Sequence, residues 1–138
     1  MDRFKPISHP SDVGMIAYGS DLKDLFANAA YGMFSLMADL GSVKPRDEFR
    51  VETKGEDRES LLVNWLNELI FIEDSKKVLL KDFKIQNLSD TMLTAIALGE
   101  RIDPKRHAVL RSVKAATYNQ LEIKKGGARW SAKVVFDV

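Results

Sequence analysis

Acidic groups near both ends of the chain are the first candidates for chemistry. Near the start, His9 and Asp12 precede a short apolar run. At the C-terminus, Asp137 and the α-carboxylate of Val138 are two anionic groups one residue apart, on a segment typical of a β-strand. Held on a fixed backbone, they repel each other unless a cation or a positive side chain compensates. Each segment also has a plainer interpretation, since Ser11 and Asp12 could cap local backbone N–H groups and Asp137 could point into solvent.

A third polar segment follows a predicted strand. Residues 99–107 combine charged side chains with a proline and the second histidine, His107, and residues 114–118 begin with Lys114. This connection could line a site, although its residues alone favour a solvated crossover between strands.

Composition excludes several common kinds of functional site. The 138 residues contain no cysteine and two histidines, which excludes a disulfide framework, a zinc–thiolate site, a cysteine nucleophile and a histidine-rich metal site. The eight glycines are scattered and form no phosphate-binding loop. A formal net charge of +1 argues against a strongly basic nucleic-acid binder.

Hydrophobic periodicity predicts two helices among the elements that must position these groups. Apolar residues at helical spacing run from Leu22 to Ala38, with Ser20 as the N-cap and Gly41 just beyond the end. A second apolar stripe covers residues 61–70, with acidic residues in its first turn, where they favour the positive end of the helix dipole.

The rest of the chain is rich in strand formers. We expect strands at 13–18, 49–53, 78–88, 91–99, 121–123 and 130–136. Because helices and strands mix without regular βαβ alternation, the class is α+β: two main helices packed on mostly antiparallel β-sheet, in a single domain over residues 1–138. No run approaches the ~18 apolar residues of a membrane span, and residues 1–6 do not resemble a signal peptide. We therefore expect a cytoplasmic protein with no membrane partner.

Six sequence blocks, in order, resemble the archease family. They are His9-Pro-Ser-Asp12-Val-Gly14, Leu25-Phe26-x-Asn28-Ala29-Ala30, Trp65-Leu-Asn-Glu-Leu69, Gly99-Glu100 with Asp103-Pro104 and His107, Lys114-Ala-Ala-Thr-Tyr118, and Phe136-Asp137-Val138. The resemblance covers essentially the whole chain. It implies an archease-like fold and no enzymatic activity, but a role in tRNA splicing as activator of the RtcB-type RNA ligase. Archeases promote guanylylation and multiple turnover of that ligase and broaden its nucleotide use, so RNA is a partner only indirectly, through the ligase.

The resemblance also implies a metal site. Archeases hold a divalent cation, most likely calcium, at positions that match Asp12, Asp137 and Val138. These three groups together could supply as many as six oxygen ligands, and calcium prefers about 6–8 of them. The family's usual threonine and alanine before the aspartate are replaced here by Pro10 and Ser11, a change that stiffens the loop without removing a ligand.

Other residues are assigned to partner activation. Lys114 matches a lysine associated with activity in the family, and His9 and His107 are assigned to the same role. Asn119 stands where many members have a histidine, so a role for that imidazole is in doubt. Two other classes stay open: a chaperone-like binding module for RNA-processing proteins, and a free-standing metal-dependent hydrolase, for which the sequence offers no evident general base.

Overall fold

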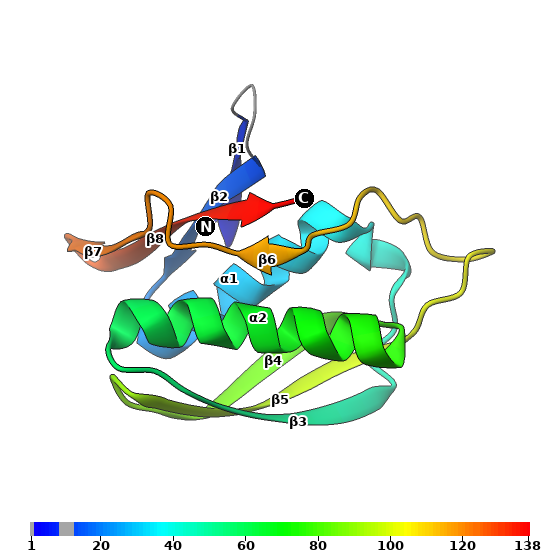
Figure 1. The fold of residues 1–138 in the computed structure, drawn as a ribbon, viewed down its shortest axis with the longest axis horizontal. Coiled ribbons are helices and arrows are strands. Elements are labelled where there is room, and N and C mark those ends of the chain that lie inside the picture. The colour runs from blue at the N-terminus through cyan, green and yellow to red at the C-terminus, as the bar shows by residue number, and fades with distance from the viewer. Residues whose placement is uncertain (1, 9–12) are drawn as a thin grey trace.

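Two helices lie between two antiparallel β-sheets (Figure 1) in the computed structural model, which describes residues 2–8 and 13–138. In chain order the elements are β1 (Phe4–Ser8), β2 (Val13–Gly19), α1 (Leu22–Met37), the 3-10 turn η1 (Leu40–Ser42), β3 (Asp47–Lys54), α2 (Arg58–Lys76), β4 (Val78–Leu88), β5 (Met92–Arg101), β6 (Ala115–Ala116), β7 (Glu122–Gly126) and β8 (Arg129–Asp137). The expected α+β class, with two main helices on antiparallel strands, is confirmed.

The strands divide between the two sheets. The larger sheet has five strands in the order β1-β2-β8-β6, with β7 pairing the other part of β8, and the smaller sheet has the order β3-β5-β4. The β4–β5 and β7–β8 hairpins are found as predicted. Gly127 takes a positive φ of 66° at the second of these turns. Strands β1 and β6 were not predicted from the sequence, since β1 contains a proline and β6 is two residues long.

Helix α1 begins one residue later than the sequence predicted. Its N-cap is Asp21, whose side chain accepts a hydrogen bond from the backbone N–H of Asp24 at 2.8 Å. The prediction of Ser20 as the cap is wrong, because the Ser20 backbone N–H instead donates to the Asp24 carboxylate at 2.9 Å. Both acidic groups satisfy free N–H groups at the positive end of the helix.

Helix α2 is longer than its apolar stripe. It begins with a capping box, in which Asp57 and Ser60 bond each other's backbone N–H groups, and it continues to Lys76, six residues beyond the predicted stripe. Lys77 ends it in the left-handed conformation with φ 55°. The last turns are mostly exposed, so a hydrophobic pattern alone could not mark their end.

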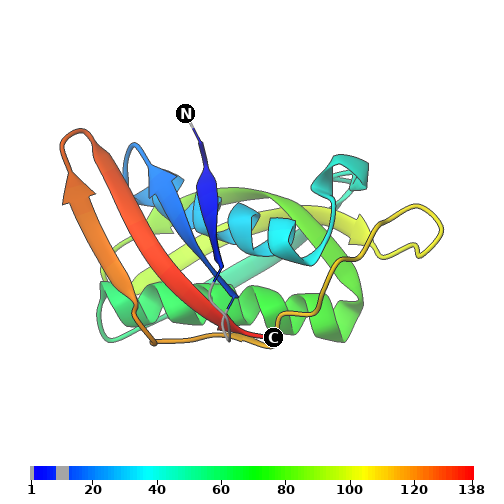
Figure 2. The ribbon, with the colours of Figure 1, turned by 90° about the horizontal axis from the view of Figure 1, so that it is seen from above.

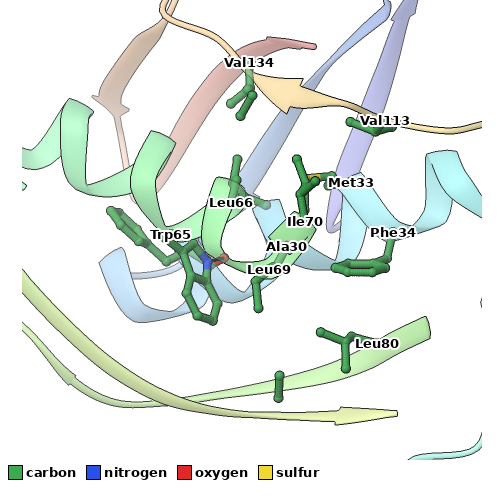
Figure 3. Packing of buried hydrophobic residues seen from close by; sticks show 14 of the residues in the cluster. Ala30, Met33, Phe34, Trp65, Leu66, Leu69, Ile70, Leu80, Val113 and Val134 are labelled. Atoms are coloured by element: carbon green, nitrogen blue, oxygen red, sulfur yellow. Dashed lines mark hydrogen bonds between the residues drawn. The ribbon is translucent and has the colours of Figure 1, made fainter. Parts of the chain in front are cut away.

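The core fills the space between the helices and both sheets (Figure 3). Trp65 of α2 is fully buried, and its indole N–H donates to the Phe26 carbonyl of α1 at 2.9 Å, so the two helices are joined by a hydrogen bond as well as by packing. Each large side chain buried in this way contributes about 1.5–3 kcal/mol. Among the described residues, no helix is both long enough and apolar enough to cross a membrane.

Candidate metal site at the end of strand β8

Strand β8 brings the last residues of the chain beside residues near its start. It pairs antiparallel with β2, and Val13 lies opposite Phe136. Val13 follows Asp12 in the sequence and Phe136 precedes Asp137, so the register connects the two acidic segments through neighbouring residues. Asp12 and His9 themselves lie outside the described residues, and their assignments stay predictions.

The other side of the β8 end is held by β6. Ala115 pairs with Asp137, and the Lys114 backbone N–H donates to the Asp137 carbonyl at 2.8 Å. Two residue pairs further back, the Val135 carbonyl accepts both the backbone N–H and the hydroxyl of Thr117, at 3.1 and 2.7 Å. The backbone of β8 is therefore paired with β2 as far as Phe136 and with β6 as far as Asp137, so the expected anchoring of the C-terminal strand is confirmed up to the penultimate residue.

Asn67 of α2 fixes β6 in turn. Its side-chain oxygen accepts the Ala116 backbone N–H at 2.8 Å, and its side-chain nitrogen donates to the Ala116 carbonyl at 3.3 Å. A single amide thus replaces a missing strand neighbour for β6. Sequence reasoning missed this role because the partner is 49 residues away. The only available signal was an amide side chain within the helix and off its apolar stripe.

The arrangement presents oxygen ligands on a fixed support. The Asp137 side chain is exposed, and Val138, with its α-carboxylate, is 49% exposed. Carboxylate oxygens are the ligands that calcium and magnesium prefer, so these two residues fit a hard divalent cation. Among residues 2–8 and 13–138, no three His, Asp or Glu side chains cluster as metal ligands. The described side chains alone therefore do not make up a metal site at this place, and the assignment of Asp12 and the Val138 carboxylate as further ligands stays a prediction.

A groove of about 570 Å³ separates Lys114 from the C-terminal half of α2. Phe71, Glu73 and Asp74 line it on the helix side. Burial raises the pKa of Glu73, and the neighbouring Asp74 carboxylate raises it further. Lys114 therefore takes part in two features: its backbone N–H bonds Asp137, and the residue lines a groove that also contains acidic groups.

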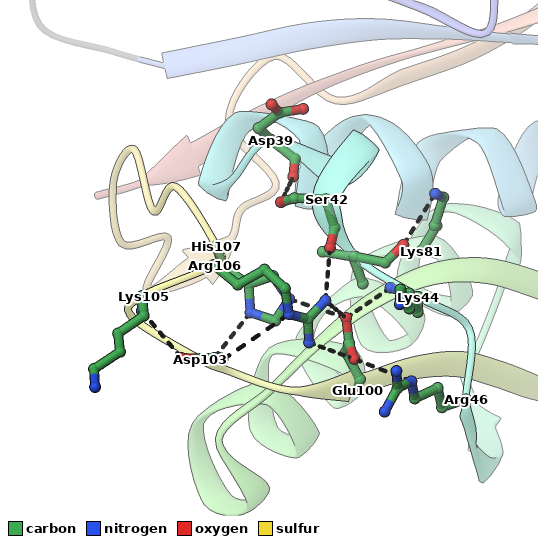
Figure 4. Close-up of polar contacts among 11 residues, drawn as sticks. Asp39, Ser42, Lys44, Arg46, Lys81, Glu100, Asp103, Lys105, Arg106 and His107 are labelled. Carbon is green, nitrogen blue, oxygen red and sulfur yellow. Dashed lines mark hydrogen bonds and ion pairs between the residues drawn. The ribbon is translucent and has the colours of Figure 1, made fainter.

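His107 lies in a different, buried network that joins the loop after β5 to the body of the protein (Figure 4). Its Nδ1 accepts the Asp103 backbone N–H at 2.8 Å, which places the ring proton on Nε2. Nε2 then donates to the Glu100 carboxylate at 3.0 Å. Because both ring nitrogens are bonded inside the protein, the geometry favours a structural role for His107 over contact with a partner.

Glu100 is the centre of this network. Arg106 donates to both of its carboxylate oxygens at 2.8 Å, and the Lys44 backbone N–H donates to it at 2.8 Å. These hydrogen bonds, that of Arg106 above all, hold the pKa of the buried Glu100 carboxyl far below its ordinary value. Sequence reasoning placed Glu100 in a solvated crossover, and that prediction is wrong because the side chain is 95% removed from solvent, at 5% exposure.

Comparisons with known proteins agree with this architecture. A sequence model of the Archease protein family matches residues 4–138. A protein archease of Methanothermobacter thermautotrophicus is 39% identical over 141 residues, with both chains covered completely. Another, from Methanosarcina acetivorans, is 34% identical over 140 residues and covers 99% of this chain and 96% of its own.

Solved structures give the same result for the fold. The solution structure of a Methanobacterium thermoautotrophicum protein is similar over the full length of both chains, with a TM-score of 0.84 at 39% identity. A crystal structure titled as an archease, possible chaperone, from Thermotoga maritima has a TM-score of 0.64 at 20% identity. It covers 97% of this chain and 96% of its own. At that identity the second likeness concerns the fold alone.

Proposed function

This chain belongs to the archease protein family, and on that premise we propose that it is an activator protein of an RtcB-type tRNA-splicing RNA ligase rather than an enzyme. In this proposal it promotes guanylylation of the ligase, permits repeated turnover and broadens nucleotide use. The observation that carries the proposal is the C-terminal tip, defined here as Asp137 and Val138, whose carboxylates stand on a backbone held by β2 and β6.

The tip is proposed to bind a divalent cation, most likely calcium, together with Asp12. A bound divalent cation can neutralise the charge on a nucleotide phosphate and polarise it for attack. In this proposal the Asp137 and Val138 carboxylates bind and orient the cation. The hydrogen bonds from Lys114 and Thr117 to β8 hold the backbone that carries these carboxylates. Because the ligands are fixed in advance, less conformational entropy is lost when the tip docks.

The same tip supports a second step of the proposal, in which it engages the ligase. An acidic end on a rigid strand is complementary to a basic region of a partner. If the tip binds one ligase conformation preferentially, it shifts the ligase toward the conformation that undergoes guanylylation. His9 lies three residues before Asp12 in the sequence. Lys114 lies just before β6, and its backbone N–H bonds the Asp137 carbonyl. Both are proposed to contact the ligase, whereas His107 is proposed to hold the loop after β5 in place.

Multiple-turnover ligation tests the function directly. The assay uses an RtcB-type ligase, GTP and an RNA pair with a 3′-phosphate and a 5′-hydroxyl, with this chain in substoichiometric amount. Asp137→Asn and Asp12→Asn should reduce stimulation at least about tenfold, the equivalent of about 1.4 kcal/mol, while leaving the circular dichroism spectrum unchanged. Asp47→Asn, which changes an exposed aspartate of the other sheet, should stimulate like the native chain.

Two outcomes of that assay would contradict the proposal. Full stimulation by both tip variants would show that the acidic groups have no part in activation. Turnover of RNA 3′-phosphate or 2′,3′-cyclic phosphate by this chain alone would instead support a hydrolase.

A chaperone-like module is the alternative, supported by exposed apolar side chains at Phe71, Val109 and Leu110, which are 64, 56 and 62% exposed. Exposed apolar side chains that form a contiguous patch mark protein contact surfaces, and Val109 and Leu110 are neighbours in the chain. This alternative predicts protection of unrelated RNA-processing proteins from aggregation, lost in Phe71→Ser and kept in Asp12→Asn. The ligase proposal predicts the reverse ranking of these two variants in ligation.

A further inference from the structure

The outer face of the five-stranded sheet carries a cluster of positive charge. Figure 2 looks onto this face, with β7, β8, β2 and β1 in front of the helices, and no described helix or strand covers it. Cross-strand pairing puts Lys5, Ile16, Lys133 and Glu122 in one row, and Tyr18, Ser131 and Lys124 in the next. Arg129 follows at the β7–β8 turn. We call these eight residues the basic sheet face.

Positive charge is in excess on this face although the whole chain is nearly neutral. Among these eight residues four cations, Lys5, Lys124, Arg129 and Lys133, stand with one carboxylate, Glu122, and Asp137 lies further along the same face of β8; the whole chain has 21 Lys+Arg against 20 Asp+Glu. The ammonium of Lys133 bonds the neutral Gln120 side chain at 2.8 Å, so that contact leaves its charge uncompensated. Glu122 approaches Lys124 at 3.4 Å, and both side chains are well exposed. A polyanion is the complementary partner for such a surface.

A flat polar platform lies within the charged cluster. The Arg129 guanidinium sits 4.1 Å from the centre of the Tyr18 ring. A hollow of about 500 Å³ opens over this pair and is lined by residues of β2, β7 and β8, including Ile16, Ser131 and Lys133. Aromatic rings and guanidinium planes are the groups on which unpaired bases stack.

We propose that the basic sheet face binds single-stranded RNA. Lys124 and Lys133 contact the phosphates, and one base stacks on the platform made by Tyr18 and Arg129. This inference goes beyond the proposed function and replaces the expectation that RNA is met only through the ligase. A net charge of +1 argues against a strongly basic nucleic-acid binder, but the sum over the chain does not show that cations gather on one face.

The platform favours a single RNA strand over other polyanions. Double-stranded RNA is bound through its shape across about 16 base pairs, which exceeds one face of this small sheet. An acidic peptide that adds a strand bonds the backbone of a free sheet edge, whereas the cations here belong to side chains on the outer face of β1, β7 and β8. Charge alone would suit any anion, and the Tyr18–Arg129 pair is the feature that favours a ligand with bases to stack.

The direction of β8 connects this face with the metal site. Alternation puts Lys133 and Asp137 on the same face of the strand, four residues and so about 13 Å apart. A strand of RNA lying on the basic sheet face would point its end toward the C-terminal tip. This connection alone rests on the proposed function; the binding of RNA does not.

Fluorescence anisotropy with a labelled single-stranded oligouridylate and this chain alone tests the proposal, with no ligase present. The native chain should bind, and Lys124→Gln combined with Lys133→Gln should weaken binding at least about tenfold. Each lost cation should also flatten the plot of log affinity against log salt by about 0.7. Lys105→Gln is the matched control, because the loop after β5 lies at the opposite end of the molecule from β7 (Figure 2). It should bind as the native chain does.

A second pair of variants tests the platform. Tyr18→Leu should weaken binding about fivefold or more, whereas Tyr18→Phe, which keeps the ring, should bind normally. Thermal unfolding confirms that each variant is folded. Absence of binding by the native chain, an equal loss in Lys105→Gln, or competition by polyglutamate as effective as that by RNA would overturn the proposal. Because the ligation assay and this assay share no component except the chain, either proposal can fail while the other stands.

Discussion

At the scale of residues, the chain holds two acidic centres with opposite characters. Asp137 is exposed at the end of β8, where its oxygens are free to bind a cation. Glu100 is buried and accepts hydrogen bonds from Arg106, His107 and a backbone N–H, so its negative charge is compensated inside the protein. Two of the sequence blocks that carry the family resemblance thus have different roles: the block with Asp137 forms part of the candidate site, and the block with Glu100 and His107 holds a loop.

The buried network makes a prediction about pH. Because the pKa of Glu100 is lower in the folded chain than the value of 4.5 that is ordinary for a glutamate, its charge stabilises the fold fully above that pH. This stabilisation is lost as the pH falls from 4.5 toward the lowered pKa. Glu100→Gln should lower the melting temperature at pH 7 by about 5 °C and make it less dependent on pH in acid. Thermal unfolding followed by circular dichroism between pH 2.5 and 7 measures both effects.

Glu48→Gln provides the control for that experiment, since Glu48 is an exposed carboxylate on β3. It should leave both the melting temperature and its pH dependence unchanged. If Glu100→Gln has the same acid dependence as the native chain, Glu100 is not the group whose protonation destabilises the fold.

At the scale of elements, the short strand β6 is the part on which the site depends most. It is two residues long, and it stays in place because β8 bonds one edge and the Asn67 amide bonds Ala116 on the other. Isolated strands of this length are not stable. The position of the tip therefore depends on α2, because the Asn67 side chain holds β6 and β6 holds the end of β8.

Asn67→Ala should free β6 without unfolding the protein. The Ala116 backbone N–H would lose its acceptor, so its hydrogen exchange should become at least about tenfold faster, for a loss of about 1.4 kcal/mol in local stability. Exchange at buried positions of β5 should stay as in the native chain. Asn64→Ala, which removes a comparable amide bonded to the Lys54 carbonyl one turn earlier, is the control and should leave exchange at Ala116 unaltered.

Long periodic elements could be predicted from the sequence, and short or distant contacts could not. The apolar stripe of α1 is sustained over its whole length, so the helix was found, whereas its cap was misplaced because Ser20 and Asp21 are both good caps. The anchored C-terminal strand was predicted from alternation that continues to the end. The Asn67 contact and the Glu100 network join residues whose local sequence carries no sign of their partners.

At the scale of the whole molecule, the length of β8 separates the C-terminal tip from the basic sheet face, although Lys133 and Asp137 lie on the same face of that strand. The C-terminal tip stands at one end of β8, and the basic sheet face begins nearer the other end of the same strand. The helices fill the interior between the sheets and leave the outer face of the larger sheet open (Figure 1). One strand can therefore carry an acidic site and a basic surface without neutralising either.

The tip is proposed to bind a divalent cation through Asp137 and the α-carboxylate of Val138, and calcium titration by calorimetry measures that binding. The native chain should bind one calcium ion. Asp137→Asn, and a chain extended by one residue after Val138, should each bind at least about tenfold more weakly, because each loses an anionic ligand. Asp47→Asn should bind like the native chain. Undiminished calcium affinity in both the Asp137→Asn and the extended chain would contradict the account.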